Sequence, residues 1–399
     1  MSRVHRILAA ALLVLTGCGY SNALYNARRQ VSDAERAAPG GAAVAATDAY
    51  VRVLDGAAAV YRRDPDGRDA GEALFLVGWA RFGLGEHAAA LAALRRSLER
   101  PARPDVHAAA RAYLGAAALE LGQPHTAAAV LDSAIAELAA STLSARAHLW
   151  RARARIALGH AGARDDLDRA EAAGGALARE ARLHAAALAI AASDSVRAAE
   201  AFHALLEDAG TERSDSLADA ARLLAARWRL HGLDDPAQLA DIRTLLLPAS
   251  PTESVHALLE ALRVLGALLD AADEQGHALA LFAAAELARD DLDAPALART
   301  LLLAYAERAP ASVWAPKALL AAATLGGPDD AILAAIEGAA DNVYVAATRG
   351  PVDAAAFAAA ETQLARELAA IRGEAATAVA DSVGLARRVV TDTLRVPHP

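Results

Sequence analysis

Leu76–Leu98 reads LVGWARFGLGEHAAALAALRRSL, and Tyr113–Ile135 reads YLGAAALELGQPHTAAAVLDSAI, at an offset of 37 residues. At this offset small and apolar residues coincide at four positions, which are Gly78/Gly115, Gly85/Gly122, Ala90/Ala127 and Leu94/Leu131. Trp150–Ala172 is a third copy, in which Ala152 and Gly159 take the positions of the two glycines. Self-similarity at a fixed period is typical of repeat proteins, which stack one structural unit many times. The chain is therefore predicted to be a repeat array.

The repeated unit is predicted to be helical. Alanine-rich segments punctuated by leucine run along the whole chain, and β-branched residues are few. Such segments favour helix, and most of them are bounded by Gly, Pro, Asp or Ser. Helix pairs are expected throughout, beginning with residues 21–38 and 45–63, then 70–85 and 87–100. No segment shows the alternating pattern of a strand. The expected fold class is all-α, a solenoid of stacked helix pairs without a sheet, from about Leu24 to Arg372.

The copies resemble tetratricopeptide repeats. In that family a small residue in the first helix lets the second helix pack closely, a glycine ends the first helix, and a small residue in the second helix fits against its partner. The resemblance assigns these three roles to Gly78, Gly85 and Ala90, and in the next copy to Gly115, Gly122 and Ala127. It implies a right-handed α-solenoid whose first helices line a concave face.

Several features depart from the family. The period of 37 residues in this chain exceeds the family's usual length of about 34. The aromatic residue usual in the turn is replaced by His87 and Pro124, and the third copy has Arg164 where the second helix needs a small residue. Later units, from Leu217 onward, keep the rhythm of helix pairs but drift in period. A generic alanine-rich α-solenoid is the alternative to the named family.

Ala298–Ala323, ARTLLLAYAERAPASVWAPKALLAAA, contains a joint between two predicted helices. It is similar to the inter-repeat linkers of periplasmic tetratricopeptide proteins, including β-barrel assembly lipoproteins and cell-division coordinators. Pro316 is expected to open the second helix, where the missing N–H of proline costs nothing, and Trp314 to pack across the joint. The expected segments are a signal peptide (1–17), a lipidated N-terminus with a first helix pair (18–68), tetratricopeptide-like repeats (69–325), and C-terminal helices with a polar tail (326–399).

The N-terminus has the pattern of a secretory signal. Two arginines precede the apolar run Ile7–Leu15, and small residues then lead to Cys18, the single cysteine of the chain. A basic start, a short apolar run and a small-residue cleavage site form that pattern. The run is too short to cross a bilayer, which takes about 20 apolar residues in a helix. LTGC (Leu15–Cys18) resembles the lipobox of bacterial lipoproteins, which implies diacylglyceryl transfer to the Cys18 thiol and cleavage after Gly17.

This resemblance places the mature chain in the bacterial cell envelope. Several acyl chains together anchor a protein stably, whereas one alone binds only marginally. Gly19 rather than an aspartate follows the cysteine, which favours the outer membrane, facing the periplasm, under the familiar sorting rule. The alternative is an ordinary signal peptide with a cysteine nearby by chance.

Composition and motifs argue against several classes of function. The formal charge of −9 becomes −11 without residues 1–17, and no basic patch dominates, so nucleic acid is not an expected partner. The metalloprotease, phosphate-loop and nucleophile-elbow motifs do not occur. The acidic clusters at 165–168 and 289–293 suit helix flanks better than calcium, because they lack the spaced oxygens and glycine of a calcium loop. We therefore expect no enzymatic activity, no cofactor and no metal.

The predicted binding surface lies on the concave face of the clearest repeat. Phe75, Trp79 and Phe82 are spaced by four and three residues, which places them on one helical face. The corresponding face of the third copy carries Arg146 and Arg153. An aromatic patch beside an arginine patch suits a peptide of mixed apolar and acidic character. We expect an exposed Trp79 at its centre, because desolvated tryptophans dominate binding energy at interfaces.

The aromatic residues also have an alternative role in the core. Phe75 and Phe82 would then pack between repeats, and Tyr50 or Tyr61 from the preceding helix pair would cover Trp79. The two roles differ in the exposure of the tryptophan, because a core side chain is shielded from water and an interface anchor is not.

Two classes of function are consistent with the whole sequence. The first is a membrane-tethered scaffold for protein–protein interaction in envelope assembly or secretion. The second is a lipoprotein that captures a solute or glycan and partners an outer-membrane importer. An aromatic content of 4% is low for sugar stacking, and it favours the scaffold.

We predict that Cys18→Ser abolishes lipid labelling and releases the chain from the membrane fraction, because only a thiol forms the thioether to the diacylglyceryl group. Metabolic labelling with a fatty-acid analogue and membrane fractionation are the measurements. If the variant stays membrane-bound with an uncleaved precursor, the apolar segment is the anchor and the lipobox assignment is wrong.

Overall fold

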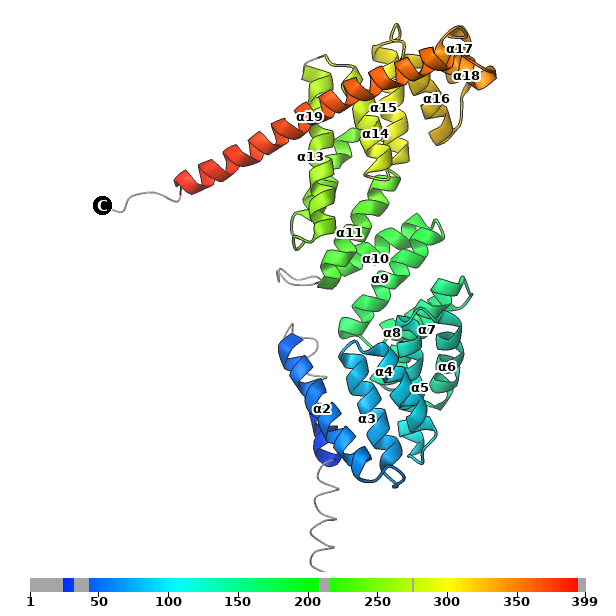
Figure 1. Cartoon of the computed structure of the whole chain (residues 1–399), viewed down its shortest axis with the longest axis vertical. Coiled ribbons are helices and arrows are strands. Elements are labelled where there is room, and N and C mark those ends of the chain that lie inside the picture. The colour runs from blue at the N-terminus through cyan, green and yellow to red at the C-terminus, as the bar shows by residue number, and fades with distance from the viewer. Residues whose placement is uncertain (1–23, 32–42, 208–215, 275, 394–399) are drawn as a thin grey trace, which may run out of the picture. The chain divides into compact units, whose positions relative to one another are not determined.

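The computed structural model describes residues 24–31, 43–207, 216–274 and 276–393 of the chain (Figure 1). Cys18, the predicted signal peptide and residues 394–399 lie outside these ranges. Within them the regular elements are all helices, and no strand is formed, which confirms the all-α fold without a sheet. No helix among the described residues is long and apolar enough to cross a membrane.

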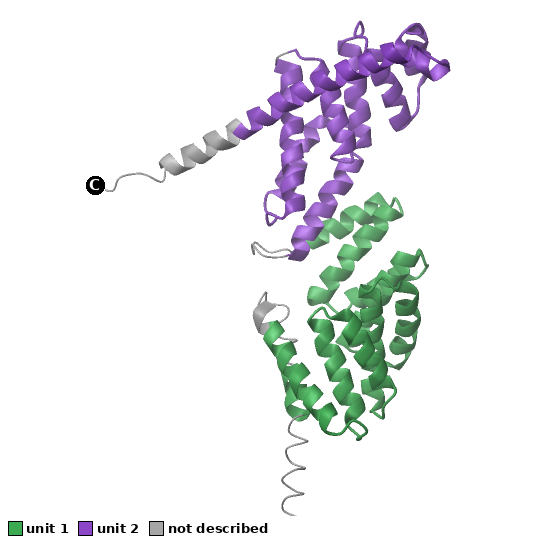
Figure 2. Ribbon diagram, viewed as in Figure 1, with its two compact units in different colours: residues 1–208 green, residues 209–399 purple. Residues whose placement is uncertain are grey.

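The chain forms two compact units, Met1–Asp208 and Ala209–Pro399 (Figure 2). The division falls inside residues 69–325, which the sequence predicts as one repeat region. Helices of the same unit share a core, and each unit is built around its own hydrophobic cluster, with a smaller cluster under α7–α9 in the first unit.

The first unit consists of helices packed in successive pairs. It begins with a helix over residues 24–31. The helices that follow are α2 (Ala43–Arg63), α3 (Ala70–Gly83), α4 (His87–Leu98), α5 (Pro104–Glu120), α6 (Pro124–Glu137), α7 (Thr142–Leu158), α8 (Ala163–Glu171), α9 (Gly175–Ala191) and α10 (Ser195–Glu207). Paired neighbours are α3 with α4, α5 with α6, α7 with α8, and α9 with α10. The first helices also contact one another, α3 with α5, α5 with α7, and α7 with α9.

Close contact at a glycine joins the two helices of a pair. A Cβ atom on Gly78 would lie 2.5 Å from Cγ of Leu94, and one on Gly115 would lie 2.6 Å from Cγ of Leu131. Both leucines are fully buried, so neither has room to retreat. Only a hydrogen fits at these two positions, which is the role that the sequence predicts for both glycines.

The second repeated glycine ends the first helix of each pair. Gly85, Gly122 and Gly159 have φ of +76°, +69° and +66°, in the left-handed region that glycine adopts at the end of a helix. Each follows its helix by at most two residues. The three glycines therefore turn the chain in the same way in three consecutive pairs.

The third pair corrects one detail of the alignment. Arg164 is exposed, and Ala163 is buried in its place. Ala163 follows Gly159 by four positions, whereas Ala127 follows Gly122 by five. The third copy is one residue shorter at this turn, so a constant offset misplaces the register of α8 by one residue. The small residue that the repeat requires is present.

In the second unit successive helices pack on one another from α11 to α16, and a long helix closes the unit. Its elements are α11 (Ser216–His231), the 3-10 helix η2 (Pro236–Gln238), α12 (Leu239–Leu246), α13 (Glu253–Glu274), α14 (Leu279–Asp290), α15 (Pro295–Arg308), α16 (Ala315–Gly326), α17 (Asp330–Gly338), α18 (Val343–Arg349) and α19 (Ala354–Thr393). The long helix α19 packs across α13 and α14 (Figure 1). Helix α19 thus contacts helices that lie far earlier in the sequence. In a simple row of helix pairs, each helix contacts only its neighbours in the sequence.

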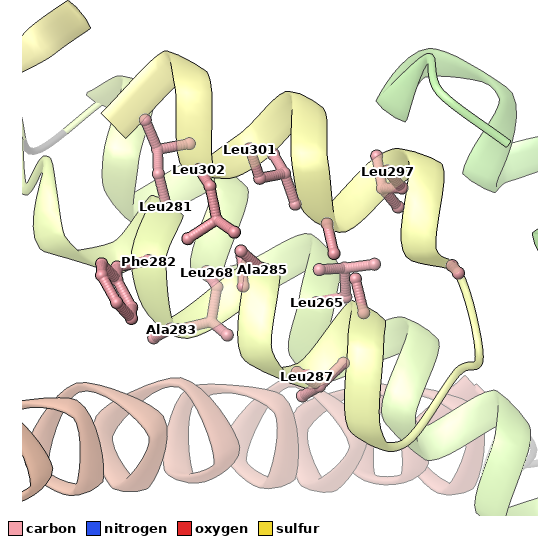
Figure 3. Packing of buried hydrophobic residues seen from close by; sticks show 14 of the residues in the cluster. Leu265, Leu268, Leu281, Phe282, Ala283, Ala285, Leu287, Leu297, Leu301 and Leu302 are labelled. Atoms are coloured by element: carbon pink, nitrogen blue, oxygen red, sulfur yellow. The ribbon is translucent and has the colours of Figure 1, made fainter. Parts of the chain in front are cut away.

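Leucine and alanine fill the core of this unit. Figure 3 shows side chains from three consecutive helices meeting in one layer, namely Leu265 and Leu268 of α13, Leu281 and Ala285 of α14, and Leu301 and Leu302 of α15. The joint between α15 and α16 is fixed by Ser312, whose Oγ lies 2.7 Å from Tyr305 Oη and accepts from the Trp314 backbone N–H. Pro316 lies in the first turn of α16, and Trp314 is buried in the core. Both agree with the prediction for this linker.

We predict opposite signs for two glycine-to-alanine substitutions. Gly78→Ala should lower the free energy of unfolding by about 1–3 kcal/mol, because the new methyl overpacks against Leu94. Gly266→Ala should raise it by about 0.5–1 kcal/mol, because Gly266 lies inside α13 with nothing within 4 Å of its Cβ position. Urea unfolding of both variants is the measurement, and equal effects at the two glycines would contradict the close contact.

Candidate functional site

The structure buries Trp79. Its side chain is 5% exposed, its ring centroid lies 5.0 Å from that of Tyr50, and its Nε1–H donates a 3.0 Å hydrogen bond to the hydroxyl of Tyr113. The expectation of an exposed tryptophan is therefore wrong, and Tyr50 is the residue that covers it. Tyr61 instead accepts a hydrogen bond from Arg96, whose guanidinium lies over the Tyr61 ring.

Phe75 and Phe82 are half-buried parts of the same packing. Their rings lie 6.2 Å and 5.6 Å from the ring of Tyr113, and Phe82 lies 5.9 Å from Trp150. We call Phe75, Trp79, Phe82, Tyr113 and Trp150 the aromatic cluster. It joins α3, α5 and α7, the first helices of three consecutive pairs. The cluster is packing between repeats, and its two phenylalanines remain partly exposed.

The predicted arginines adjoin this cluster on α7. Arg146 precedes Trp150 by four residues and Arg153 follows it by three, so both neighbour it on the helix surface. Arg153 forms a 3.0 Å ion pair with Glu120 of α5, and its charge, after burial, helps to lower the pKa of His184 on α9 to about 4. Arg146 is half-buried and makes no ion pair or hydrogen bond with the residues that the structure describes. Both arginines thus lie on α7 beside Trp150, the residue that this helix contributes to the aromatic cluster.

A buried ionic network holds α7 to α8. Asp166 is 1% exposed and accepts hydrogen bonds from Arg151 Nη2 at 2.6 Å, Arg155 Nη1 at 2.8 Å and His148 Nδ1 at 2.8 Å. Arg151 also donates to Asp132 of α6 at 2.7 Å. Each donor reaches one carboxylate from a different turn of α7. The network is satisfied internally, which is the condition under which a buried charge is tolerated.

The electrostatics of Asp166 follow from these contacts. Burial raises the pKa of Asp166, but the hydrogen bonds from His148 and Arg151 and the charges of Arg151 and Arg155 outweigh burial and lower it to about 2. The carboxylate is therefore ionised at neutral pH. An acceptor with its oxygens already occupied is poorly suited to acid–base chemistry, and we assign this network to structure.

Sequence reasoning places Asp166 on a helix flank, whereas the structure places it in the interior. The signal that reveals it is the spacing of His148, Arg151 and Arg155, which lie at i, i+3 and i+7 on one face of α7. Arg151 takes the position of Val77 and Leu114 in the two earlier copies. A polar stripe that replaces apolar residues on one helical face indicates a buried charged partner on the facing helix. No group of three or more His, Cys, Asp or Glu side chains suited to a metal occurs among the residues described.

No family model matches the chain, and no curated protein matches its sequence.

We predict that Asp166→Asn flattens the acid dependence of stability. In the native chain the stabilisation from Asp166 is fully present above its unfolded pKa of 3.8 and is lost as pH falls through its folded pKa of about 2, a change of about 2 kcal/mol. Asp165→Asn is the matched control, because Asp165 is exposed on the same helix. Urea unfolding between pH 5 and pH 2 is the measurement. If Asp166→Asn and Asp165→Asn have the same slope, the network does not stabilise the fold.

Proposed function

We propose that the chain is a non-enzymatic scaffold for protein–protein interaction of the tetratricopeptide type, anchored by lipid at Cys18 in the bacterial cell envelope. Its role would lie in envelope assembly or secretion, at the outer membrane facing the periplasm. The observation that carries this proposal is the row of contacting first helices, α3, α5 and α7, set by glycines in equivalent positions. Such rows present a continuous surface to an extended or helical segment of a partner.

The partner surface we propose consists of Phe75, Phe82, Arg146 and Arg153. Trp79 supports it from beneath, through the aromatic cluster, rather than touching the partner. Arg146 supplies a cation without a described partner, and the two phenylalanines supply apolar edges beside it. A segment that alternates apolar and acidic side chains complements both features.

The lipid anchor would hold the first unit near the bilayer. Leu24 and Ala27 of the helix over residues 24–31 are buried in the core of that unit. Six residues separate Cys18 from Leu24, and a chain of that length reaches about 20 Å at most. A partner bound by this unit would therefore be held close to the membrane surface.

Capture of a solute or glycan by stacking is less well supported. The three largest side chains of the aromatic cluster, Trp79, Tyr113 and Trp150, are buried and pack against other residues of the first unit. Sugar recognition by stacking needs exposed aromatic faces, and the buried rings do not offer them.

A photo-crosslinking amino acid at Phe75 or Phe82 should trap a partner in intact envelopes, whereas the same residue at Val196, which is exposed on α10, should not. Arg146→Glu should reduce the trapped product about fivefold, in line with the loss of one surface ion pair and the added repulsion. Arg197→Glu, on the exposed surface of α10, is the matched control. Equal products from Phe75, Phe82 and Val196 would contradict the proposed surface, and so would an Arg146→Glu product as abundant as that of Arg197→Glu.

A further inference from the structure

The second unit contains an open apolar pocket between α15, α16 and α17. Its volume is about 580 Å³, within the range of roughly 300–1,000 Å³ found for small-molecule sites. Leu303, Pro310 and Leu319 form one side of it, and Ile332, Ala335 and Ala339 form the other.

The short helix α17 leaves this pocket open because most of its pocket-facing residues are small. Ile332 is its only buried residue and anchors the helix to the rest of the unit. Ala335, Gly338 and Ala339 follow along the pocket wall and fill little of the space. A helix with leucines at these positions would close the pocket, so the cavity results from the side chains that this sequence places there.

The charges of the lining are all negative. Glu307 and Asp329 line the pocket, and no Arg, Lys or His does. Asp329 accepts the Ile332 backbone N–H at 2.8 Å and lies 3.6 Å from Arg299, so its charge is largely compensated. Glu307 is exposed and makes no ion pair or hydrogen bond with the residues that the structure describes.

Nearby cations are engaged elsewhere. Arg308, which follows Glu307, donates to Asp273 and to the carbonyl of Ala272. Lys317, the only lysine of the chain, pairs with Glu361 of α19. The negative charge of Glu307 at the pocket edge therefore has no nearby partner to neutralise it.

We propose that this pocket binds a small molecule with an apolar body and a cationic group, an ammonium or a guanidinium. The apolar body is held by the leucine, isoleucine, proline and alanine walls, and each buried CH₂ strengthens binding about fourfold. The cationic group stays at the edge beside Glu307, where it keeps part of its hydration and avoids the cost of burying a charge. This site is independent of the scaffold role, which depends on the first unit.

The test compares three probes of equal chain length, n-octylammonium, n-octanol and n-octanoate, by calorimetric titration of the full chain. Octylammonium should bind at one saturable site, about fivefold more tightly than octanol, with octanoate weaker still. Equal binding of the three probes would show a purely apolar pocket and overturn the proposal. Tighter binding of octanoate, or no saturable binding, would overturn it as well.

Two pairs of variants locate the site. Ala335→Phe should fill the pocket and abolish octylammonium binding, whereas Ala334→Phe, exposed on the same helix but outside the lining, should leave it unchanged. Glu307→Gln should remove the preference for octylammonium over octanol, whereas Glu337→Gln should keep it, since Glu337 is exposed outside the lining. Unchanged binding in Ala335→Phe or an unchanged preference in Glu307→Gln would contradict the site.

If a Leu-Lys-Leu-Lys tetrapeptide displaces octylammonium and binds more tightly, the occupant is a peptide, and the small-molecule assignment is wrong.

Discussion

The close contact between a glycine and a leucine in paired helices is the constraint on which the repeat array depends. At Gly78 and Gly115 the partner leucine leaves room for a hydrogen alone, so the two helix axes come closer than side chains would otherwise allow. The alanine-rich composition allows a similarly close approach of helices along the rest of the chain, because most positions that face a neighbouring helix are small. Such a core buries little area per residue. Its few large side chains therefore carry a large share of the packing between pairs, and this is why Trp79, Tyr113 and Trp150 lie inside the first unit.

The same constraint explains which parts of the fold could be predicted from the sequence. The offset of 37 residues and the recurring glycines mark contacts within a pair. The predicted pairing of α3 with α4 and of α5 with α6 is found, as are the glycines that end the first helices and the α15–α16 linker. Contacts between pairs do not follow that offset. Trp79 bonds to Tyr113, which is 34 residues away, and it is covered by Tyr50 of the preceding helix. Helical spacing alone gives the face on which a tryptophan lies, but not whether the next repeat supplies a side chain large enough to cover it.

Asp166 shows how a one-residue change alters the interior of a repeat. The shorter turn after Gly159 rotates α8 by about 100° relative to the aligned register. This rotation brings Ala163 and Leu167 inward and carries Asp166 with them. A buried carboxylate requires compensation, and Arg151, Arg155 and His148 provide it from the facing helix. Removing one member of such a network leaves an uncompensated buried charge and costs about 3–5 kcal/mol. Asp166 and its donors on α7 can therefore be substituted only together, whereas each apolar contact of the earlier pairs can be substituted separately.

Use of the large aromatics for internal packing also limits how the proposed scaffold can recognise a partner. The phenylalanine edges and the arginines that remain at the surface each contribute little, since an exposed ion pair is worth about 0–1 kcal/mol. Affinity would then have to come from several contacts along the row of first helices, and from restricting both partners to one membrane. A tether that holds a binding site near a surface converts a weak encounter into one at high effective concentration. The proposed anchor at Cys18 and the short connection to Leu24 supply such a tether, so a modest binding surface and a lipid anchor are consistent with one another in this chain.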